Sequence, residues 1–230
     1  MDFYIIPILF GNSMDTLFGI ENDVIIMYNL FYTFHLKHSN TWHKPLIFLN
    51  DDCILSNIKE ILTNLNYNEA KIIFIIYFSG HSNSKGHLKF YNSKISSSTF
   101  LNYFNKHLKH PCQIYFIIDT CCSKNFTNNL ILNIKNYNLI EKIYFMGSSM
   151  DNECSKEIEA EFDKKLFKHK KIKQCKIFIV GIFTLYFVIL IKTRNILTLI
   201  DFKNIINDKL WKMISNKYVQ TIYYEEFINF

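Results

Sequence analysis

The sequence predicts an α/β protein whose fold is a three-layer sandwich around a mostly parallel central sheet. Two segments, 71–78 and 114–118, are continuously apolar, without alternation of polar and apolar residues. Such runs are typical of strands that are buried on both faces of a parallel sheet. Segments with apolar residues at helical spacing, of which 54–65 is the clearest, lie between the predicted strands. Strands and helices that alternate in this way indicate a parallel sheet covered by helices.

The remaining elements follow from the same patterns. Further strands are predicted at 3–10, 45–49, 143–146 and 218–227, with a short hairpin arm at 86–92. Further helices are predicted at 23–35, 96–108, 183–193 and 201–215. Because Pro7 has no backbone N–H, we expect the first strand to be an edge strand, or Pro7 to lie at a strand end.

The composition indicates one domain with a sizeable core, because 49% of the 230 residues are apolar. The net charge is +6, but Arg194 is the only arginine. Since nucleic-acid recognition relies on the planar arginine side chain, we expect a solvated lysine surface and no nucleic-acid partner.

The cysteines, the first ten residues and one long apolar segment bear on the location of the protein. Six cysteines occur without a C-x-x-C pair, so we expect neither a disulfide framework nor a metal site. The first residues, MDFYIIPILF, lack the basic region of a signal peptide, which favours a cytoplasmic protein. The apolar segment 177–191 is 15 residues long, shorter than the ~20 residues that a bilayer requires. We expect it to form a strand or turn that leads into a buried helix, with no membrane contact.

Unusual side chains follow two of the buried strands. The first strand is followed by Ser79-Gly80-His81, and the second by Asp119-Thr120-Cys121-Cys122. The segment between them suits one right-handed crossover, so the two strands are expected to be neighbours. An imidazole beside a thiol can take the thiol proton and so produce the nucleophilic thiolate. Each residue also has a structural explanation, as a small buried cysteine or a hydrogen-bonded histidine, and the spacing alone leaves both readings open.

The motifs YFSGHS and IIDTCCS resemble those of the caspase-like cysteine peptidases, and of the metacaspase branch in particular. Weaker matches to the family occur in the family's order at 19–31, 146–157 and 181–190. The legumain and GPI-transamidase branch is a more distant resemblance. The resemblance implies a caspase-like fold, Cys121 as the nucleophile and His81 as the general acid/base.

The resemblance also implies a substrate pocket and an oxyanion hole. Asp23, Ser79 and Asp119 match positions that bind a substrate Lys or Arg before the scissile bond. A buried pair of carboxylates would favour such a cation. The backbone N–H groups of Ser82 and Cys121 would form the oxyanion hole. We therefore expect peptide or protein substrates with basic residues.

The sequence departs from the family pattern at two positions and in one segment. Ser82 and Lys124 replace glycines. Segment 82–95 lacks the acidic cluster that binds activating calcium in many metacaspases, so we expect no cofactor and either independence of calcium or weak calcium binding elsewhere. The two replaced glycines leave open an inactive caspase-fold module that binds peptidases or their substrates.

We expect residues 1–230 to form a single caspase-like domain. A homodimer is the oligomer considered for it. Its large-subunit-like part would span 1–163 and its small-subunit-like part 177–230. The lysine-rich segment 164–176 between them is expected to be an exposed loop.

Overall fold

A computed structural model of the chain describes residues 3–14, 17–64, 71–128, 136–161, 177–193 and 220–228. Its centre is a six-stranded sheet with the strand order β10-β7-β6-β3-β1-β2. The strands are β1 (Phe3–Asn12), β2 (Leu46–Leu49), β3 (Lys71–Gly80), β6 (Cys112–Asp119), β7 (Ile140–Gly147) and β10 (Tyr223–Ile228). All neighbouring strands are parallel except the pair β10 and β7. The predicted mostly parallel sheet is confirmed.

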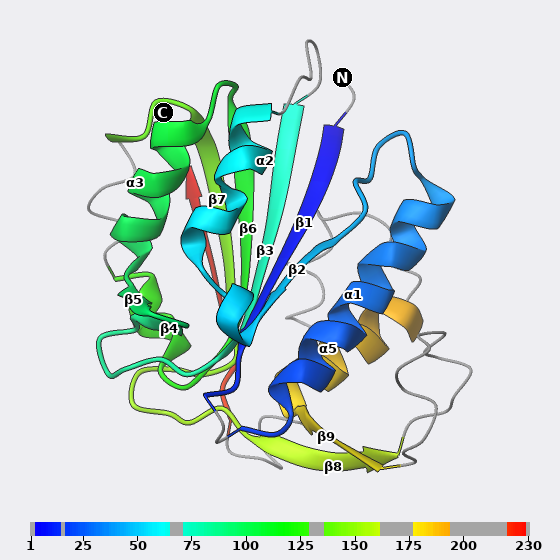
Figure 1. Ribbon diagram of the computed structural model, residues 1–230. Helices are drawn as coiled ribbons and strands as arrows, with labels where there is room; N and C mark the ends of the chain where they lie inside the picture. Colours follow the sequence, from blue (N-terminus) through cyan, green and yellow to red (C-terminus); the bar gives the residue numbers. More distant parts are fainter. Residues whose placement is uncertain are drawn as a thin grey trace.

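Helices cover both faces of this sheet (Figure 1). On one face lie α1 (Ile20–Lys37) and α5 (Ile182–Thr193), and on the other lie α2 (Lys59–Asn64) and α3 (Ser97–His107). A 3-10 turn, Leu55–Ile58, leads into α2, so the helix predicted at 54–65 is only partly α-helical. Each face has its own apolar core, which accounts for the three layers.

The first strand is not at an edge of the sheet, contrary to the expectation from Pro7. Strand β1 lies between β3 and β2, and Pro7 is paired with Ile75 of β3. On the other side, Pro7 falls between the Ile5–Trp42 bridge and the first β1–β2 pair, Ile8–Leu46. The missing N–H is tolerated because the ladder is interrupted on that side at this point.

The connection from β3 to β6 contains a hairpin and a capped helix. Strands β4 (Leu88–Phe90) and β5 (Ser93–Ile95) form the hairpin, of which the sequence indicated one arm. Helix α3 follows, and the Ser96 hydroxyl accepts a hydrogen bond of 3.1 Å from the Thr99 N–H. Ser96 is therefore the N-cap of this helix, which lies within the range predicted at 96–108.

A second hairpin closes the carboxyl edge of the sheet, and only half of it was expected. Strand β8 (Glu157–Glu161) pairs antiparallel with β9 (Ile177–Gly181), which leads directly into α5. Figure 1 shows this hairpin beyond the carboxyl ends of the parallel strands, next to α1. The apolar segment 177–191 is therefore a strand followed by a helix that packs on the sheet.

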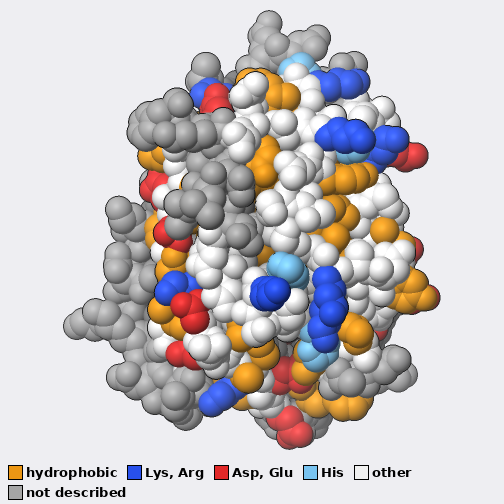
Figure 2. Space-filling model, turned by 90° about the vertical axis from the view of Figure 1, so that its left-hand side faces the viewer, with side chains coloured by type: hydrophobic (Ala, Val, Ile, Leu, Met, Phe, Trp, Pro, Cys, Tyr) orange, Lys and Arg blue, Asp and Glu red, His pale blue; other side chains and the backbone are white. Residues whose placement is uncertain are grey.

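Two expectations fall outside the described residues, namely the helix at 201–215 and the exposed lysine-rich loop at 164–176. The boundaries of the two subunit-like parts therefore stay predictions. In the part of the chain that is described, no helix has the length and apolar character needed to cross a membrane. Figure 2 shows the face on the α3 side, where lysine side chains lie in small groups separated by uncharged surface.

Candidate active site

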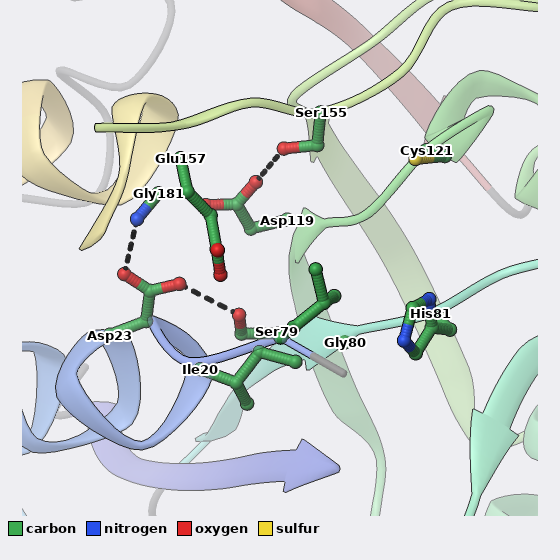
Figure 3. A pocket seen from close by; sticks show the side chains of 11 residues that line it. Ile20, Asp23, Ser79, Gly80, His81, Asp119, Cys121, Ser155, Glu157 and Gly181 are labelled. Atoms are coloured by element: carbon green, nitrogen blue, oxygen red, sulfur yellow. Dashed lines mark hydrogen bonds between the residues drawn. The ribbon is translucent and has the colours of Figure 1, made fainter. Parts of the chain in front are cut away.

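The pairing of β3 with β6 places His81 and Cys121 at the same edge of the sheet. Strands β3 and β6 are parallel neighbours, and Ser79 is paired with Asp119. His81 and Cys121 each follow two residues later, and both line the same pocket (Figure 3). The structure thus brings the imidazole and the thiol to one site, as the two motifs indicated.

The pocket joins these two residues to a group of carboxyl side chains. Its volume is about 90 Å³, and in Figure 3 His81 and Cys121 lie at one side of it while the carboxyl groups lie toward the other. Five of the six predicted site residues line it, and Ser82 does not. The five are Asp23, Ser79, His81, Asp119 and Cys121.

Asp23 connects three elements beneath the pocket. It lies in the first turn of α1 and its side chain is buried. One carboxylate oxygen accepts a hydrogen bond of 2.8 Å from the Gly181 N–H, and the other accepts one of 2.9 Å from the Ser79 hydroxyl. Asp23 therefore holds β9 and the end of β3 against α1.

Asp119 makes a comparable set of contacts at the end of β6. Its Oδ1 accepts a hydrogen bond from the Ser155 hydroxyl at 2.5 Å. Its Oδ2 accepts bonds from Thr184, at 2.8 Å from the hydroxyl and 3.3 Å from the backbone N–H. These contacts join β6 to the start of α5 and to the chain segment before β8.

The close approach of β9 to both carboxylates requires a glycine at position 181. A Cβ atom there would lie 2.4 Å from Asp119 Oδ2 and 3.0 Å from Asp23 Oδ2. The glycine lets the backbone reach the two acids, which explains its place at the strand-to-helix junction.

Two pocket residues, Ser155 and Glu157, were not singled out from the sequence. Glu157 begins β8, and its Oε1 accepts a hydrogen bond of 3.0 Å from the Gly19 N–H. Both residues lie within 146–157, a segment noted only for its general resemblance to the family. Because β8 was not predicted, nothing in the sequence placed them in the pocket.

Burial makes the carboxyl groups of this pocket difficult to ionise. Loss of solvation raises the pKa of Asp23 well above its usual value, and the charge of Asp119 raises it further. Burial also raises the pKa of Asp119, although its hydroxyl donors oppose this. The pKa of Glu157 is raised too, by burial and then by the charge of Asp119. Three such carboxyl groups form an environment in which a bound cation would favour ionisation of all three.

The candidate nucleophile and base are both uncharged at neutral pH. Burial raises the pKa of the Cys121 thiol to about 11, and the neighbouring Cys154 adds to the increase. Burial lowers the pKa of His81, and the charge of Lys89 lowers it further. The free site therefore favours a neutral thiol and a neutral imidazole over a preformed ion pair.

A network of buried hydroxyl groups fixes the loop that carries Cys121. Thr120 donates its N–H to the Ser148 hydroxyl at 3.1 Å, and its carbonyl accepts from both Ser148 and Ser149. The Ser123 N–H donates to Ser149 at 3.0 Å. These bonds hold Cys122 in a left-handed conformation, with φ of 49°, at the turn after the candidate nucleophile.

Both residues that replace family glycines have defined contacts. The Ser82 hydroxyl donates a short hydrogen bond to the Cys121 carbonyl oxygen, which ties the two motif loops together. The Lys124 ammonium lies 3.3 Å from Asp151 and over the Tyr223 ring, and Lys124 does not line the pocket. Neither side chain obstructs the site.

Although potential metal ligands line the pocket, no group of three or more His, Cys, Asp or Glu residues in the described part of the chain is arranged to hold a metal ion. The carboxyl oxygens of Asp23 and Asp119 instead accept hydrogen bonds from protein donors.

Comparison with known proteins supports the caspase-like fold. A family model described as "Caspase domain" matches residues 5–182. No curated protein matches the sequence. The crystal structure of protein GSU0716 from Geobacter sulfurreducens is similar, with a TM-score of 0.55 and 11% identity. The match covers 98% of this chain and 93% of that one, and at this identity the likeness concerns the fold alone.

Proposed function

Because the chain belongs to the caspase-domain family, we propose that it is a cysteine endopeptidase with Cys121 as the nucleophile and His81 as the general acid/base. The family supports a peptidase in general. The observation that supports this assignment of roles is the position of both side chains in one pocket, each two residues beyond the register pair Ser79–Asp119.

The neutral state of both groups suits a mechanism in which the proton moves during attack. His81 takes the thiol proton as the Cys121 sulfur attacks the substrate carbonyl carbon. His81 then gives this proton to the leaving amine, which leaves an acyl group on Cys121. A water molecule, deprotonated by His81, attacks the thioester and releases the carboxylic acid and the free thiol.

Two backbone groups are suited to stabilise the oxyanion formed in these steps. Within the described residues, the N–H groups of Ser82 and Cys121 donate no hydrogen bond to another residue. The bond from the Ser82 hydroxyl to the Cys121 carbonyl holds the two loops against each other. This arrangement supports the assignment of both N–H groups to the oxyanion hole, where preorganised donors lower the barrier.

The substrate class that fits the pocket is a peptide with Lys or Arg before the scissile bond. Asp23, Asp119 and Glu157 line the pocket, and an ammonium or guanidinium group would compensate their charge in a desolvated place. An acidic substrate side chain would meet three carboxyl groups and would gain no such compensation. We therefore propose cleavage after basic residues.

Hydrolysis of matched fluorogenic peptides tests this proposal. We expect the full chain to cleave peptides with Lys or Arg before the reporter group and to leave the matched Asp peptide intact. Cys121→Ala should abolish turnover, while Cys122→Ala, which changes the neighbouring thiol, should retain it. Equal cleavage by wild type and Cys121→Ala would refute the assignment.

One observation favours a second function, that of a binding module without catalysis. Burial and Cys154 raise the pKa of Cys121 to about 11, so little thiolate exists at neutral pH in the free protein. In that case the pocket would bind basic peptides and release them intact. Isothermal titration with a Lys peptide, followed by mass spectrometry of that peptide, separates the two functions.

A further inference from the structure

Two hydrogen bonds align the loop of Cys121 with the segment that precedes β8. The Cys122 N–H donates to the Glu153 carbonyl at 2.8 Å, and the Ser155 hydroxyl donates to Asp119 at 2.5 Å. Cys121 and Cys154 lie between these two contacts along their respective segments. The two segments run in opposite directions, so the two cysteines are brought opposite each other.

The electrostatic surroundings of the Cys121 sulfur agree with this alignment. Beside the effect of burial, the Ser155 backbone lowers the pKa of the Cys121 thiol and the Cys154 thiol raises it, as expected of groups close to this sulfur. Figure 3 shows Cys121 and Ser155 on adjacent segments above the pocket. Cys154 is exposed and Cys121 is half-buried, so solvent reaches the pair from the Cys154 side.

The other cysteines described by the structure are less suited to react with Cys121. Cys53 and Cys112 are buried in the apolar core, away from the pocket. Cys122 is the chain neighbour of Cys121, and a bridge between adjacent cysteines would distort the left-handed turn at Cys122. Cys154 is therefore the favoured partner.

We propose that Cys121 and Cys154 are a site of reversible oxidation, at which hydrogen peroxide or an organic hydroperoxide produces a disulfide. The Cys154 thiolate attacks a peroxide oxygen, the O–O bond breaks, and hydroxide and a sulfenic acid are formed. The Cys121 sulfur then attacks the sulfenic sulfur, and the hydroxyl group leaves as water with the Cys121 proton. A dithiol restores both thiols by exchange and becomes a cyclic disulfide itself.

The disulfide would remove the sulfur that the proposed peptidase uses. That consequence depends on the proposed function, whereas formation of the disulfide depends only on the contacts between the two segments. The bridge would also protect Cys121 from further oxidation to sulfinic or sulfonic acid, which dithiols do not reverse.

Peptide mapping of the full chain after treatment with hydrogen peroxide tests the site. Free thiols are blocked with iodoacetamide, the protein is digested without reductant, and linked peptides are sequenced by mass spectrometry. We expect a peptide linked through Cys121 and Cys154 in wild type and in the matched control Cys122→Ser, and none in Cys154→Ser. A bridge from Cys121 to Cys122, or full alkylation of Cys121 after peroxide, would overturn the proposal.

Recovery of activity provides a second and separate readout. After peroxide and then dithiothreitol, wild type should regain its peptidase activity, whereas Cys154→Ser should stay inactive with Cys121 over-oxidised. Equal recovery of the two proteins would contradict the protective role. If no form of the protein has activity, the proposed function fails, and the linked peptide still decides whether the disulfide site exists.

Discussion

Ser79 and Asp119 are direct partners in the parallel pairing of β3 and β6, and both side chains reach into the same pocket. Ser79 donates to Asp23, and Asp119 accepts from Ser155 and Thr184. Ser79 and Asp119 thus line the pocket as a pair. His81 and Cys121, each two positions further along the chain, line the same pocket. The predictions below follow from this arrangement.

Replacement of Asp23 by Asn should make the protein more stable than wild type, by an amount that grows as the pH rises. The pKa of Asp23 is about 3.8 in an unfolded chain and is raised well above this value by burial and by Asp119. The folded protein therefore keeps a proton that the unfolded chain releases, so stability is lost as the pH rises through the interval between the two values. Asn imitates the protonated form and avoids this loss.

Denaturant unfolding at a series of pH values checks the prediction. The difference in unfolding free energy in favour of Asp23→Asn should be smallest below pH 3.8, where the carboxyl group is protonated in both states, and should grow as the pH rises above that value. The exposed Asp51→Asn serves as the control and should follow wild type. Parallel curves for wild type and Asp23→Asn would show that Asp23 is ionised without cost.

Alkylation of Cys121 should continue to accelerate at alkaline pH. Because the pKa of this thiol is raised to about 11, the thiolate fraction should rise about tenfold per pH unit below that value. Chloroacetamide labelling followed by peptide mapping gives the rate at Cys121 alone. Cys154→Ser should shift the profile to lower pH, since Cys154 raises the pKa of Cys121. A plateau beginning near pH 6 would indicate a preformed thiolate–imidazolium pair.

Glu157 should contribute to the proposed preference for basic substrates. Its side chain lines the pocket and provides the third carboxyl group there, beside Asp23 and Asp119. In Glu157→Gln we expect kcat/KM for Lys peptides to fall about tenfold, which corresponds to roughly 1.4 kcal/mol, with a smaller change for a matched Gln peptide. Glu159→Gln, an exposed position on the same strand, is the control. Equal losses with both peptides would assign Glu157 a structural role only.

Restoring the family glycine at Ser82 should lower the proposed peptidase activity. The hydroxyl of Ser82 bonds to the Cys121 carbonyl, and Ser82→Gly removes this link while loosening the backbone. We expect a lower kcat with a smaller change in KM, measured on a Lys peptide. The exposed Ser84→Gly adds the same flexibility two residues away and should retain the kcat of wild type. A higher kcat in Ser82→Gly would mean that the hydroxyl obstructs catalysis.

Much of the site was predictable because its candidate nucleophile and base lie next to the two apolar runs, which are the clearest strand patterns in the sequence. The apolar runs 71–78 and 114–118 became parts of β3 and β6, and His81 and Cys121 each lie three residues after one of these runs, so their positions near strand ends were evident. By contrast, β8 alternates Glu with Ile158 and Ala160, a weak signal for a strand. Ser155 and Glu157 were missed for that reason.

Other features could not be predicted, because they depend on contacts between residues that are far apart in the sequence. The position of Pro7 in an inner strand is tolerated only because the ladder to β2 is interrupted there, which a single sequence does not reveal. Likewise, the changes to Ser82 and Lys124 suggested damage to the site. The structure shows that one bonds to Cys121 and the other lies outside the pocket.

Covalent labelling with a lysyl chloromethyl ketone tests the central claim most directly. The claim is that Cys121 and His81 act together beside a pocket for a basic side chain. We predict that the probe modifies Cys121 in wild type, as located by peptide sequencing, and that His81→Ala and an excess of free Lys peptide each slow this reaction. Modification of Cys122 or Cys154 in its place, or an unchanged rate in His81→Ala, would contradict the account.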